Sequence, residues 1–570
     1  MKQCPECKLV YADQTLNYCL EDGTVLVQRS EESESATQII PSPHTTSEDP
    51  TRSFRSGGIP QDGIPSNLPS IHESQGTSKT KLWLAVAGVA LLVLAVGFFG
   101  YRYARPAGSG QIGSIAVMPL VNASGDADSE YLSDGMTETL INSLAQLPNL
   151  AVKGRGSVFR YKGKETDPKQ VAADLGVQAV LNGRLLKRGD SVTLSLDLVD
   201  ANTGNQIWGE QYVRNISDIA ALQKEIARDV SNKLKNKLSG TDQQNMAKGH
   251  TADPEAYQLY LQGLYLWNQR TEDSAAKARE FFQKAIDEDP KYALAYVGLA
   301  NGYIINDRPA EYNEKAKAAA AKALELDPSL GEAHTILANV AFWFEWDFPR
   351  AEAEFKKAIQ LSPNYPTAHH WYGETLGALG RFEESSAEFA RAAELDPVSM
   401  AILTDQGMAF IYARQYDRAI AHFKELIEID PNFVRTHFYL ADAYRGKGMF
   451  PEAIESRRKG LLLDGMPPAR AEAASKRLMD AYTTSGANGY WRMRMELRLE
   501  GSKRNGEPVD QYDMAIDHAN LGNSDKAFES LEAGLKDRRV GLVFLKVDYI
   551  WDKIRSDPRF ADLVRRVGLP

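Results

Sequence analysis

The chain is most strongly constrained by a row of prolines that recurs at nearly constant spacing in its second half. Asp or Ser precedes each of them, and neighbouring prolines stand 38, 35, 34 and 34 residues apart. The five are Pro290, Pro328, Pro363, Pro397 and Pro431. A proline ends a helix, and a period of this length indicates a unit of two helices that buries its apolar face only against its neighbours. The spacing predicts a stack of about six such units between Pro254 and Asp464.

Each unit also carries a small residue twelve positions before its proline. These are Ala278, Ala316, Ala351, Ser385 and Ala419, and four of the five units have Phe eight positions before the proline. A small side chain lets two helices approach closely where they cross, and the Phe fills the gap to the next unit. The pattern resembles the tetratricopeptide repeat, which implies an all-α solenoid over residues 251–465. Residues 466–570 are less periodic, and their end resembles the helical cap that closes such arrays.

The resemblance implies that the first helix of each unit lines a concave groove. Aromatic, amide and charged side chains occur together at the groove-facing positions, a mixture that suits an extended peptide. They are Asn301, Ile304, Asn339, Trp343, His370, Glu374, Met408, Tyr412, Phe438, Asp442 and Arg445. The alternative is that several of them only pack between helices. Val297 stands where the resemblance would place a cation that clamps a carboxylate, so capture of a peptide's C-terminus is disfavoured.

The adjacent pair His369-His370 raises the question of a metal site in the array. Adjacent residues of a helix point about 100° apart. No second His pair or carboxylate cluster with ligand spacing accompanies this pair in the sequence. We therefore predict no metal ion at these histidines.

One apolar run, from Leu82 to Gly100, is long enough to cross a bilayer. It reads LWLAVAGVALLVLAVGFFG, contains no charged or amide side chain, and has basic residues close to each end. A helix rises about 1.5 Å per residue, so the run covers close to the roughly 30 Å of bilayer hydrocarbon. We therefore predict one transmembrane helix at 82–101. The alternative is a buried helix of a soluble domain, which is usually shorter and carries a polar face.

The residues before this run divide into a short head, 1–27, and a linker, 28–78. Cys4 and Cys7 are spaced to place two thiolates on one zinc ion, Cys19 offers a third ligand, and Asp22 follows three residues later. The head resembles a zinc-ribbon tip with its fourth cysteine replaced by a carboxylate, which implies a structural zinc site. The alternative is a metal-free remnant. The linker is rich in Ser, Thr, Pro, Glu and Gly and is predicted to be disordered.

Residues 112–240 alternate between strand and helix patterns. Strands are predicted at 115–119, 150–153, 179–186, 192–199 and 207–213, and helices after an N-cap at Asp134, at 170–175 behind Asp167-Pro168, and at 218–238. The stretches SIAVMPLVNASGDADSEYLSDGM and GVQAVLNGRLLKRGDSVTLSLDLVDANTGNQIWGEQY resemble the TolB amino-terminal-like domain. The resemblance implies a compact α/β module of a bacterial protein, with a binding or scaffolding role.

The expected location follows from the cysteines, all three of which lie in the head. A thiol-rich metal site favours the reducing side of a membrane, whereas the basic residues that flank the span are balanced and do not decide its orientation. We expect a single-pass protein of a bacterial inner membrane, with the head in the cytoplasm and the TolB-like and repeat regions outside it.

Charge and motifs exclude several classes of function. The net charge of −10 argues against a nucleic-acid-binding body, and the sequence has no glycine-rich phosphate loop and no GxSxG nucleophile. The loop Ser124-Gly125-Asp126 follows a strand, where ligands often bind, but a turn that satisfies its own backbone is favoured. We expect a membrane-anchored scaffold rather than an enzyme, whose groove binds peptides or proteins. The alternatives are a transmembrane signalling protein that couples partner binding to the head, and an enzyme with an unrecognised site in the TolB-like domain.

Ultracentrifugation of a cell lysate without detergent tests the predicted span. About twenty consecutive apolar residues partition into hydrocarbon, so the full chain is expected in the membrane pellet. A variant that lacks 82–101 is expected in the supernatant. Full-length chain that remains in the supernatant would contradict the span.

Overall fold

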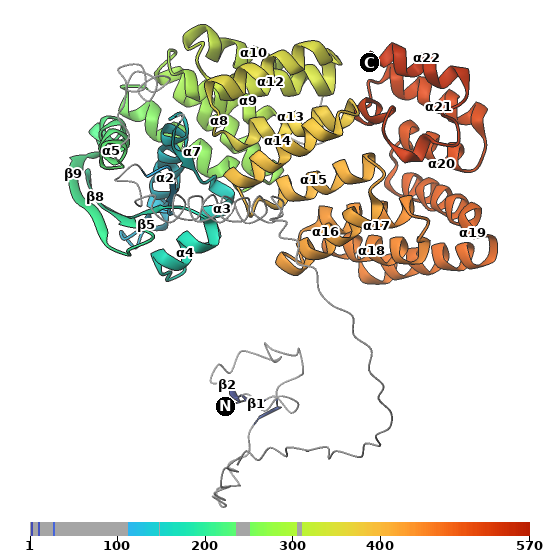
Figure 1. The fold of residues 1–570 in the computed structure, drawn as a ribbon, viewed down its shortest axis with the longest axis horizontal. Coiled ribbons are helices and arrows are strands. Elements are labelled where there is room, and N and C mark those ends of the chain that lie inside the picture. The colour runs from blue at the N-terminus through green and yellow to red at the C-terminus, as the bar shows by residue number, and fades with distance from the viewer. Residues whose placement is uncertain are drawn as a thin grey trace, which may run out of the picture. The chain divides into compact units, whose positions relative to one another are not determined.

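The computed structural model (Figure 1) describes residues 2–3, 10–11, 27–28, 112–147, 149–234, 251–304 and 310–570. The chain forms two units, Met1–Phe98 and Phe99–Pro570. Outside the described residues lie the predicted zinc ligands Cys4, Cys7, Cys19 and Asp22, the linker from residue 29 onward and the predicted span 82–101. Among the helices that are described, none combines the length and the apolar character that a bilayer crossing requires.

In the first unit three short strands pair into an antiparallel sheet. The strands are β1 (Lys2–Gln3), β2 (Val10–Tyr11) and β3 (Val27–Gln28). Their order is β2-β1-β3, so β1 pairs with a strand on each side. The sheet therefore brings together residues from both ends of the sequence that forms the predicted head.

The second unit begins with a six-stranded mixed sheet. Its strands are β4 (Ser114–Val117), β5 (Val121–Asn122), β6 (Ala151–Val152), β7 (Ala179–Arg188), β8 (Ser191–Asp200) and β9 (Gln206–Asn215). The order is β6-β4-β7-β8-β9, with β5 also paired to β7. Strands β4, β5, β6 and β7 run parallel, and β7, β8 and β9 form an antiparallel meander. Along β8 every second side chain from Val192 to Leu198 is buried, as the apolar alternation predicts.

Four helices accompany this sheet: α2 (Glu130–Ala145), α3 (Arg155–Phe159), α4 (Pro168–Leu175) and α5 (Ile219–Lys233). Helix α4 begins as predicted, because the Asp167 carboxylate accepts a hydrogen bond from the backbone N–H of Lys169 at 3.0 Å. The predicted N-cap at Asp134 is wrong. Asp126 already caps the preceding 3-10 turn η1 (Ala127–Ser129), so α2 starts at Glu130 and Asp134 lies inside it, ion-paired with Lys162 at 2.6 Å.

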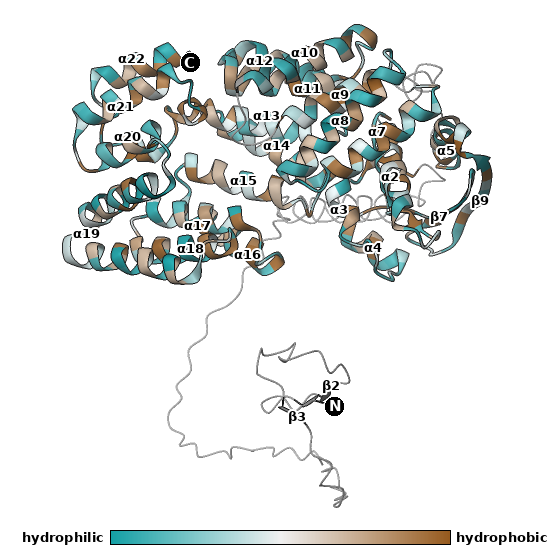
Figure 2. Ribbon diagram, turned by 180° about the vertical axis from the view of Figure 1, so that it is seen from behind, coloured by the Kyte–Doolittle hydropathy of each residue, from teal (hydrophilic) through white to brown (hydrophobic). Residues whose placement is uncertain are grey.

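Six helical hairpins follow between residues 254 and 463 and form an all-α solenoid. In chain order the pairs are α7 (Pro254–Trp267) with α8 (Glu272–Glu288), α9 (Ala293–Tyr303) with α10 (Ala310–Leu326), α11 (Gly331–Val340) with α12 (Phe348–Leu361), α13 (Pro366–Ala378) with α14 (Phe382–Leu395), α15 (Met400–Tyr412) with α16 (Tyr416–Ile429), and α17 (Val434–Gly446) with α18 (Phe450–Leu463). Polar and apolar residues alternate along these helices in Figure 2, as expected of helices with one buried face.

Small residues and aromatic rings hold the helices of this solenoid together. The five small residues that precede the repeat prolines are all buried, and so are the Phe residues four positions after them. The ring of Phe282 lies against both Gly263 and Gly298, where a Cβ atom would come within 2.6 and 2.5 Å of it. Phe389 lies against Gly373 in the same manner, at 3.0 Å from the position of a Cβ. The repeat pattern predicts this packing.

A buried interface joins the sheet domain to the solenoid. Helix α2 packs along α7 (Figure 1). The side-chain amide of Asn364 donates hydrogen bonds to the carbonyls of Leu147 and Leu150 at 2.9 and 3.0 Å. The Ser157 hydroxyl donates to the carboxylate of Asp396. A buried polar group that loses its partner costs about 1–3 kcal/mol, so these bonds fix the domain in one orientation on the hairpins.

The residues after the last hairpin form a cap that folds back along the array. Its elements are α19 (Pro468–Asn505, bent at Ser485-Gly486), α20 (Gln511–Asn520), α21 (Ser524–Lys536), the 3-10 turns η4 (Val540–Phe544) and η5 (Tyr549–Trp551), and α22 (Pro558–Val567). Helix α19 covers α18, as expected of a cap. The cap also reaches the third hairpin, where Trp551 and Leu563 share a core with Phe342 and Phe348.

The substitution Ala351→Trp tests the packing of the hairpins. Ala351 is fully buried where α12 crosses its neighbours, and an indole there overpacks the core, which typically costs about 1–3 kcal/mol or more. We expect a lower melting temperature by circular dichroism. Ala353→Trp, two residues away at an exposed position, is the matched control and should melt like the parent chain. Equal melting of both variants would contradict the observed register.

Candidate binding site on the concave face

Four consecutive hairpins, the third to the sixth, present their first helices side by side. Helix α13 neighbours α11, α15 neighbours α13, and α17 neighbours α15. Helix α11 is continued by a π-helical turn, η3 (Ala341–Glu345), which carries Trp343. These helices enclose a recess of about 80 Å³, lined chiefly by Trp343, Glu374, Asp405, Met408, Tyr412 and Tyr439, with Phe544 contributed by the cap. The recess brings together four of the residues that the sequence assigns to the groove, Trp343, Glu374, Met408 and Tyr412.

Four ionisable side chains form a cluster beside this recess. His370 and Glu374 stand one helical turn apart on α13, Asp405 lies on α15, and Arg435 lies on α17. The Arg435 guanidinium donates to both carboxylate oxygens of Asp405 at 3.0 and 3.1 Å. His370 Nε2 lies 3.0 Å from Asp405 Oδ2. The Asp405 carboxylate is thus fully paired, whereas that of Glu374 accepts no hydrogen bond from any residue that the structure describes.

The cluster changes charge close to neutral pH. Burial and the neighbouring Asp405 carboxylate raise the pKa of Glu374 to about 7. Burial lowers the pKa of His370, but the hydrogen bond and the charge of Asp405 outweigh it, so this pKa is raised overall. Arg435 stays cationic. At acidic pH the cluster therefore carries a net positive charge, and once both groups have lost their protons it carries a net negative charge.

Three groups of the cluster also have the spacing of metal ligands. The donor atoms of His370, Glu374 and Asp405 lie within 4.8 Å of one another. The pair His369-His370 in the sequence does not indicate this grouping, because Asp405 comes from another helix. However, the Arg435 guanidinium already holds both oxygens of Asp405, so a divalent ion would have to displace a cation. His369 is not part of this group, because its ring pairs with Glu388 at 2.6 Å.

The cap places an aromatic side chain between two of the groove residues. The ring of Phe544 stacks on Tyr412, with centroids 4.8 Å apart, and meets Trp343 edge to face at 5.5 Å. Aromatic pairs at these separations add about 0.5–1.5 kcal/mol to the burial of their surfaces. One wall of the recess is therefore built by the chain's own C-terminal region.

The next residues of the cap continue along the same face. The Tyr549 hydroxyl accepts a hydrogen bond from Arg445 Nε at 3.0 Å and donates to the backbone carbonyl of Asp442 at 3.0 Å. Arg414, after α15, donates to the backbone carbonyl of Val547 at 2.8 Å. Asp442 and Arg445, which the sequence assigns to a peptide groove, therefore contact the cap.

Three other residues assigned to the groove lie apart from the recess. Asn301 is partly buried on α9, Asn339 is buried on α11, and Phe438 packs against Gly460 of α18. Tyr439, the neighbour of Phe438, lines the recess instead. Asp405 and Tyr439 were not predicted from the sequence, although both stand eight residues after a repeat proline. Phe544 and Arg435 had no comparable signal.

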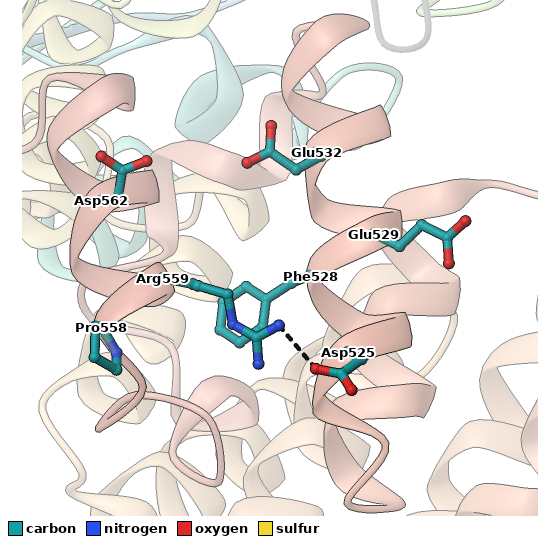
Figure 3. A pocket seen from close by; sticks show the side chains of 7 residues that line it. All are labelled: Asp525, Phe528, Glu529, Glu532, Pro558, Arg559 and Asp562. Carbon is teal, nitrogen blue, oxygen red and sulfur yellow. Dashed lines mark hydrogen bonds and ion pairs between the residues drawn. The ribbon is translucent and has the colours of Figure 1, made fainter.

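A larger recess of about 450 Å³ lies between α21 and α22 (Figure 3). Figure 3 shows the Arg559 guanidinium in front of the Phe528 ring and directed at Asp525, to which it is ion-paired at 2.8 Å. Glu532, which also lines this recess, pairs with Arg566 at 2.6 Å. These ion pairs tie α21 to α22 within the cap, so the concave recess remains the stronger candidate for a binding site.

The ionisable cluster beside the concave recess lies within recognised repeats. Residues 341–399 and 404–459 match the tetratricopeptide repeat family, and these ranges contain every residue of the ionisable cluster. The chain therefore contains tetratricopeptide repeats, a class of unit that binds proteins or peptides.

Two curated relatives each resemble part of the chain. It is 35% identical over 187 residues to "Putative adenylate cyclase 3" of Rhizobium meliloti, a match that covers 33% of this chain and 32% of that protein. It is 28% identical over 115 residues to Hsp70-Hsp90 organizing protein 3 of Arabidopsis thaliana, covering 20% of each. The chain thus spans about a third and a fifth of the length of these two relatives.

Among solved structures, the crystal structure of YrrB is described as a TPR protein with an unusual peptide-binding site. It shares 25% sequence identity with this chain, and the match covers 34% of this chain and 97% of YrrB with a TM-score of 0.25.

The substitution Glu374→Gln tests the charge state of the cluster. The pKa of Glu374 in the folded chain lies above the value of about 4.3 for an exposed glutamate, so ionising it as the pH rises towards 8 lowers stability. We expect the variant to be more stable than the parent at pH 8, by on the order of 1–3 kcal/mol. The difference should shrink at pH 5, as measured by thermal unfolding.

The exposed Glu383 supplies the control for this experiment. Glu383→Gln lies on the next helix, outside the cluster, and should change stability equally at both pH values. A Glu374→Gln variant that behaves like this control would show that burial does not perturb Glu374.

Proposed function

We propose that this chain is a membrane-anchored scaffold that holds partner proteins on the concave face of its repeats. The tetratricopeptide repeats support a role in protein interaction. The observation that carries the proposal is the recess between α11, α13, α15 and α17, where Trp343, Glu374 and Met408 remain partly exposed. Aromatic and charged groups that stay accessible in a concave site are the usual anchors of a protein partner.

The mode of binding differs from the extended peptide that the sequence suggests. The cap contacts Tyr412, Asp442 and Arg445 on the concave face. An extended peptide would need the length of the groove that these contacts occupy. We therefore favour a partner that is a folded protein and inserts a side chain into the recess.

The membrane attachment in this proposal derives from the sequence. The apolar run at 82–101 supports a single span in a bacterial inner membrane, and Cys4, Cys7, Cys19 and Asp22 support a structural zinc site in a cytoplasmic head. On this view the sheet domain, which begins about ten residues after the span, and the repeats lie outside the cytoplasm. The resemblance to the TolB amino-terminal-like domain supports a binding role for the sheet domain.

A second candidate is a signalling protein in which partner binding alters what the head recruits. The rigid bonding of the sheet domain to the repeats favours it, because Asn364 and Asp396 would transmit a displacement of the array to the domain nearest the span. A catalytic role has less support. Asp126, the acidic residue of the strand-end loop, caps η1 by accepting hydrogen bonds from the Asp128 N–H and the Ser129 hydroxyl.

Site-specific photo-crosslinking in native membranes tests the scaffold function. A photoreactive residue in place of Met408, which lines the recess, is expected to give discrete adducts with partner proteins. The same residue in place of Ile429, whose side chain is 61% exposed at the end of α16, is the matched control and should give none of those adducts. Adducts that are identical at both positions, or absent at Met408, would contradict partner binding at the concave face.

A further inference from the structure

The recess on the concave face combines aromatic walls with two carboxylates. Rings of Trp343, Tyr412, Tyr439 and Phe544 line it, together with the acidic side chains of Glu374 and Asp405. Aromatic rings attract cations through their negative faces, and the attraction grows where water is excluded. Carboxylates beside such rings add a direct ionic partner. The lining is therefore chemically suited to a compact organic cation.

Only one of the two carboxylates is available to a ligand. Arg435 and His370 together satisfy Asp405, as their distances of 3.0 to 3.1 Å show. Within the part of the chain that the structure describes, no hydrogen bond or ion pair satisfies Glu374. Partial burial makes a carboxylate without a hydrogen-bond partner costlier to ionise, and a cation in the recess would offset that cost. Glu374 thus marks the point at which a cation would be held.

We propose that the recess binds an alkylammonium group, namely the side chain of a lysine on a partner protein, with the ammonium at Glu374 and the methylene stem between the aromatic rings. The assignment of the ammonium group to a lysine of a partner protein rests on the scaffold function proposed above. A cavity holds one water molecule when about 10–15 Å³ of its space is open to the centre of a water-sized sphere. The recess has about 80 Å³ of such space, which is room for an ammonium head and part of its stem.

The geometry favours this cation over a metal ion. His370, Glu374 and Asp405 have the spacing of metal ligands, but Arg435 holds Asp405 through both oxygens. A divalent ion would need all three donors and would have to expel the guanidinium. An ammonium group needs Glu374 and the aromatic walls, and it leaves the bond between Arg435 and Asp405 intact.

The pH dependence of binding follows from the groups that face Glu374. They are His370 on its own helix, Asp405 and Tyr412 on α15, and Arg435 and Tyr439 on α17. Below pH 7 Glu374 is protonated, Arg435 is cationic, and Asp405 favours the cationic form of His370 by raising its pKa, so the cluster does not attract an ammonium ion. Above pH 7 Glu374 ionises and attracts it. Affinity for the cation is therefore expected to rise between pH 6 and pH 8.

Titration calorimetry of the full chain in detergent tests the site, with n-butylammonium as the probe and butan-1-ol as its uncharged counterpart. We expect n-butylammonium to bind at pH 8 and butan-1-ol not to bind. Glu374→Gln, which keeps the size of the side chain, should weaken binding by about tenfold or more, because it removes the charged partner. Glu383→Gln should bind like the parent. Binding of butan-1-ol with equal affinity, or an unchanged affinity in Glu374→Gln, would overturn the site.

Two peptides then test lysine as the source of the ammonium group. Acetyl-Gly-Lys-Gly-amide should compete with n-butylammonium, and the same peptide with norleucine in place of lysine should not. A lysine peptide that fails to compete would overturn the assignment to a lysine side chain.

Crosslinking separates this site from the scaffold function itself. Adducts at position 408 that survive in the Glu374→Gln background would support the scaffold and overturn the lysine site. Binding of the lysine peptide that depends on Glu374, in a chain that gives no adducts, would support the site and overturn the scaffold.

Discussion

The close approach of paired helices is the constraint on which the array depends. Phe389 packs closely against Gly373 and Phe282 packs between Gly263 and Gly298, at crossings where a Cβ atom would come within 3.0 Å or less of the ring. Repeating this contact every 34 to 38 residues aligns the first helices of successive hairpins, because each pair repeats the geometry of the one before it. Side chains 30 or more residues apart, such as Glu374 and Asp405, thereby share one recess. The recess is a consequence of the packing.

Buried hydrogen bonds add a second constraint, because they hold the sheet domain and the hairpins in one fixed arrangement. The amide of Asn364 spans from the loop before α13 to carbonyls of the sheet domain, and Asp396 does the same from the loop before α15. These loops are the turns that the repeat prolines create. Asn364 and Asp396, which lie in the turns between hairpins, thus also bind the sheet domain.

Periodicity explains which parts of the structure could be predicted from the sequence. The hairpins, the strands β7, β8 and β9, and the N-cap of α4 at Asp167 follow from local patterns of apolar, turn and capping residues. The N-cap prediction at Asp134 failed because an aspartate inside a helix cannot be told from one at its start by residue type. Asp126 caps the 3-10 turn η1, which leads directly into α2. Phe544 could not be placed in the recess, because it lies outside the repeats and no period relates it to Tyr412. The charge of the ionisable cluster could not be predicted either, since its residues lie on three helices, α13, α15 and α17.

The cap limits how much of the concave face stays open. Leu542, Val543, Leu545 and Trp551 flank the residues that meet the groove, and all four are fully buried in the core that the cap shares with the third hairpin. Freeing this segment would expose several large apolar side chains, each worth about 1.5–3 kcal/mol when buried. A peptide that competes for the groove would have to supply that energy as well as its own ordering cost. Contact with the cap therefore turns a long groove into a short recess, and the lysine binding proposed above would depend on a single side chain and the charge of Glu374.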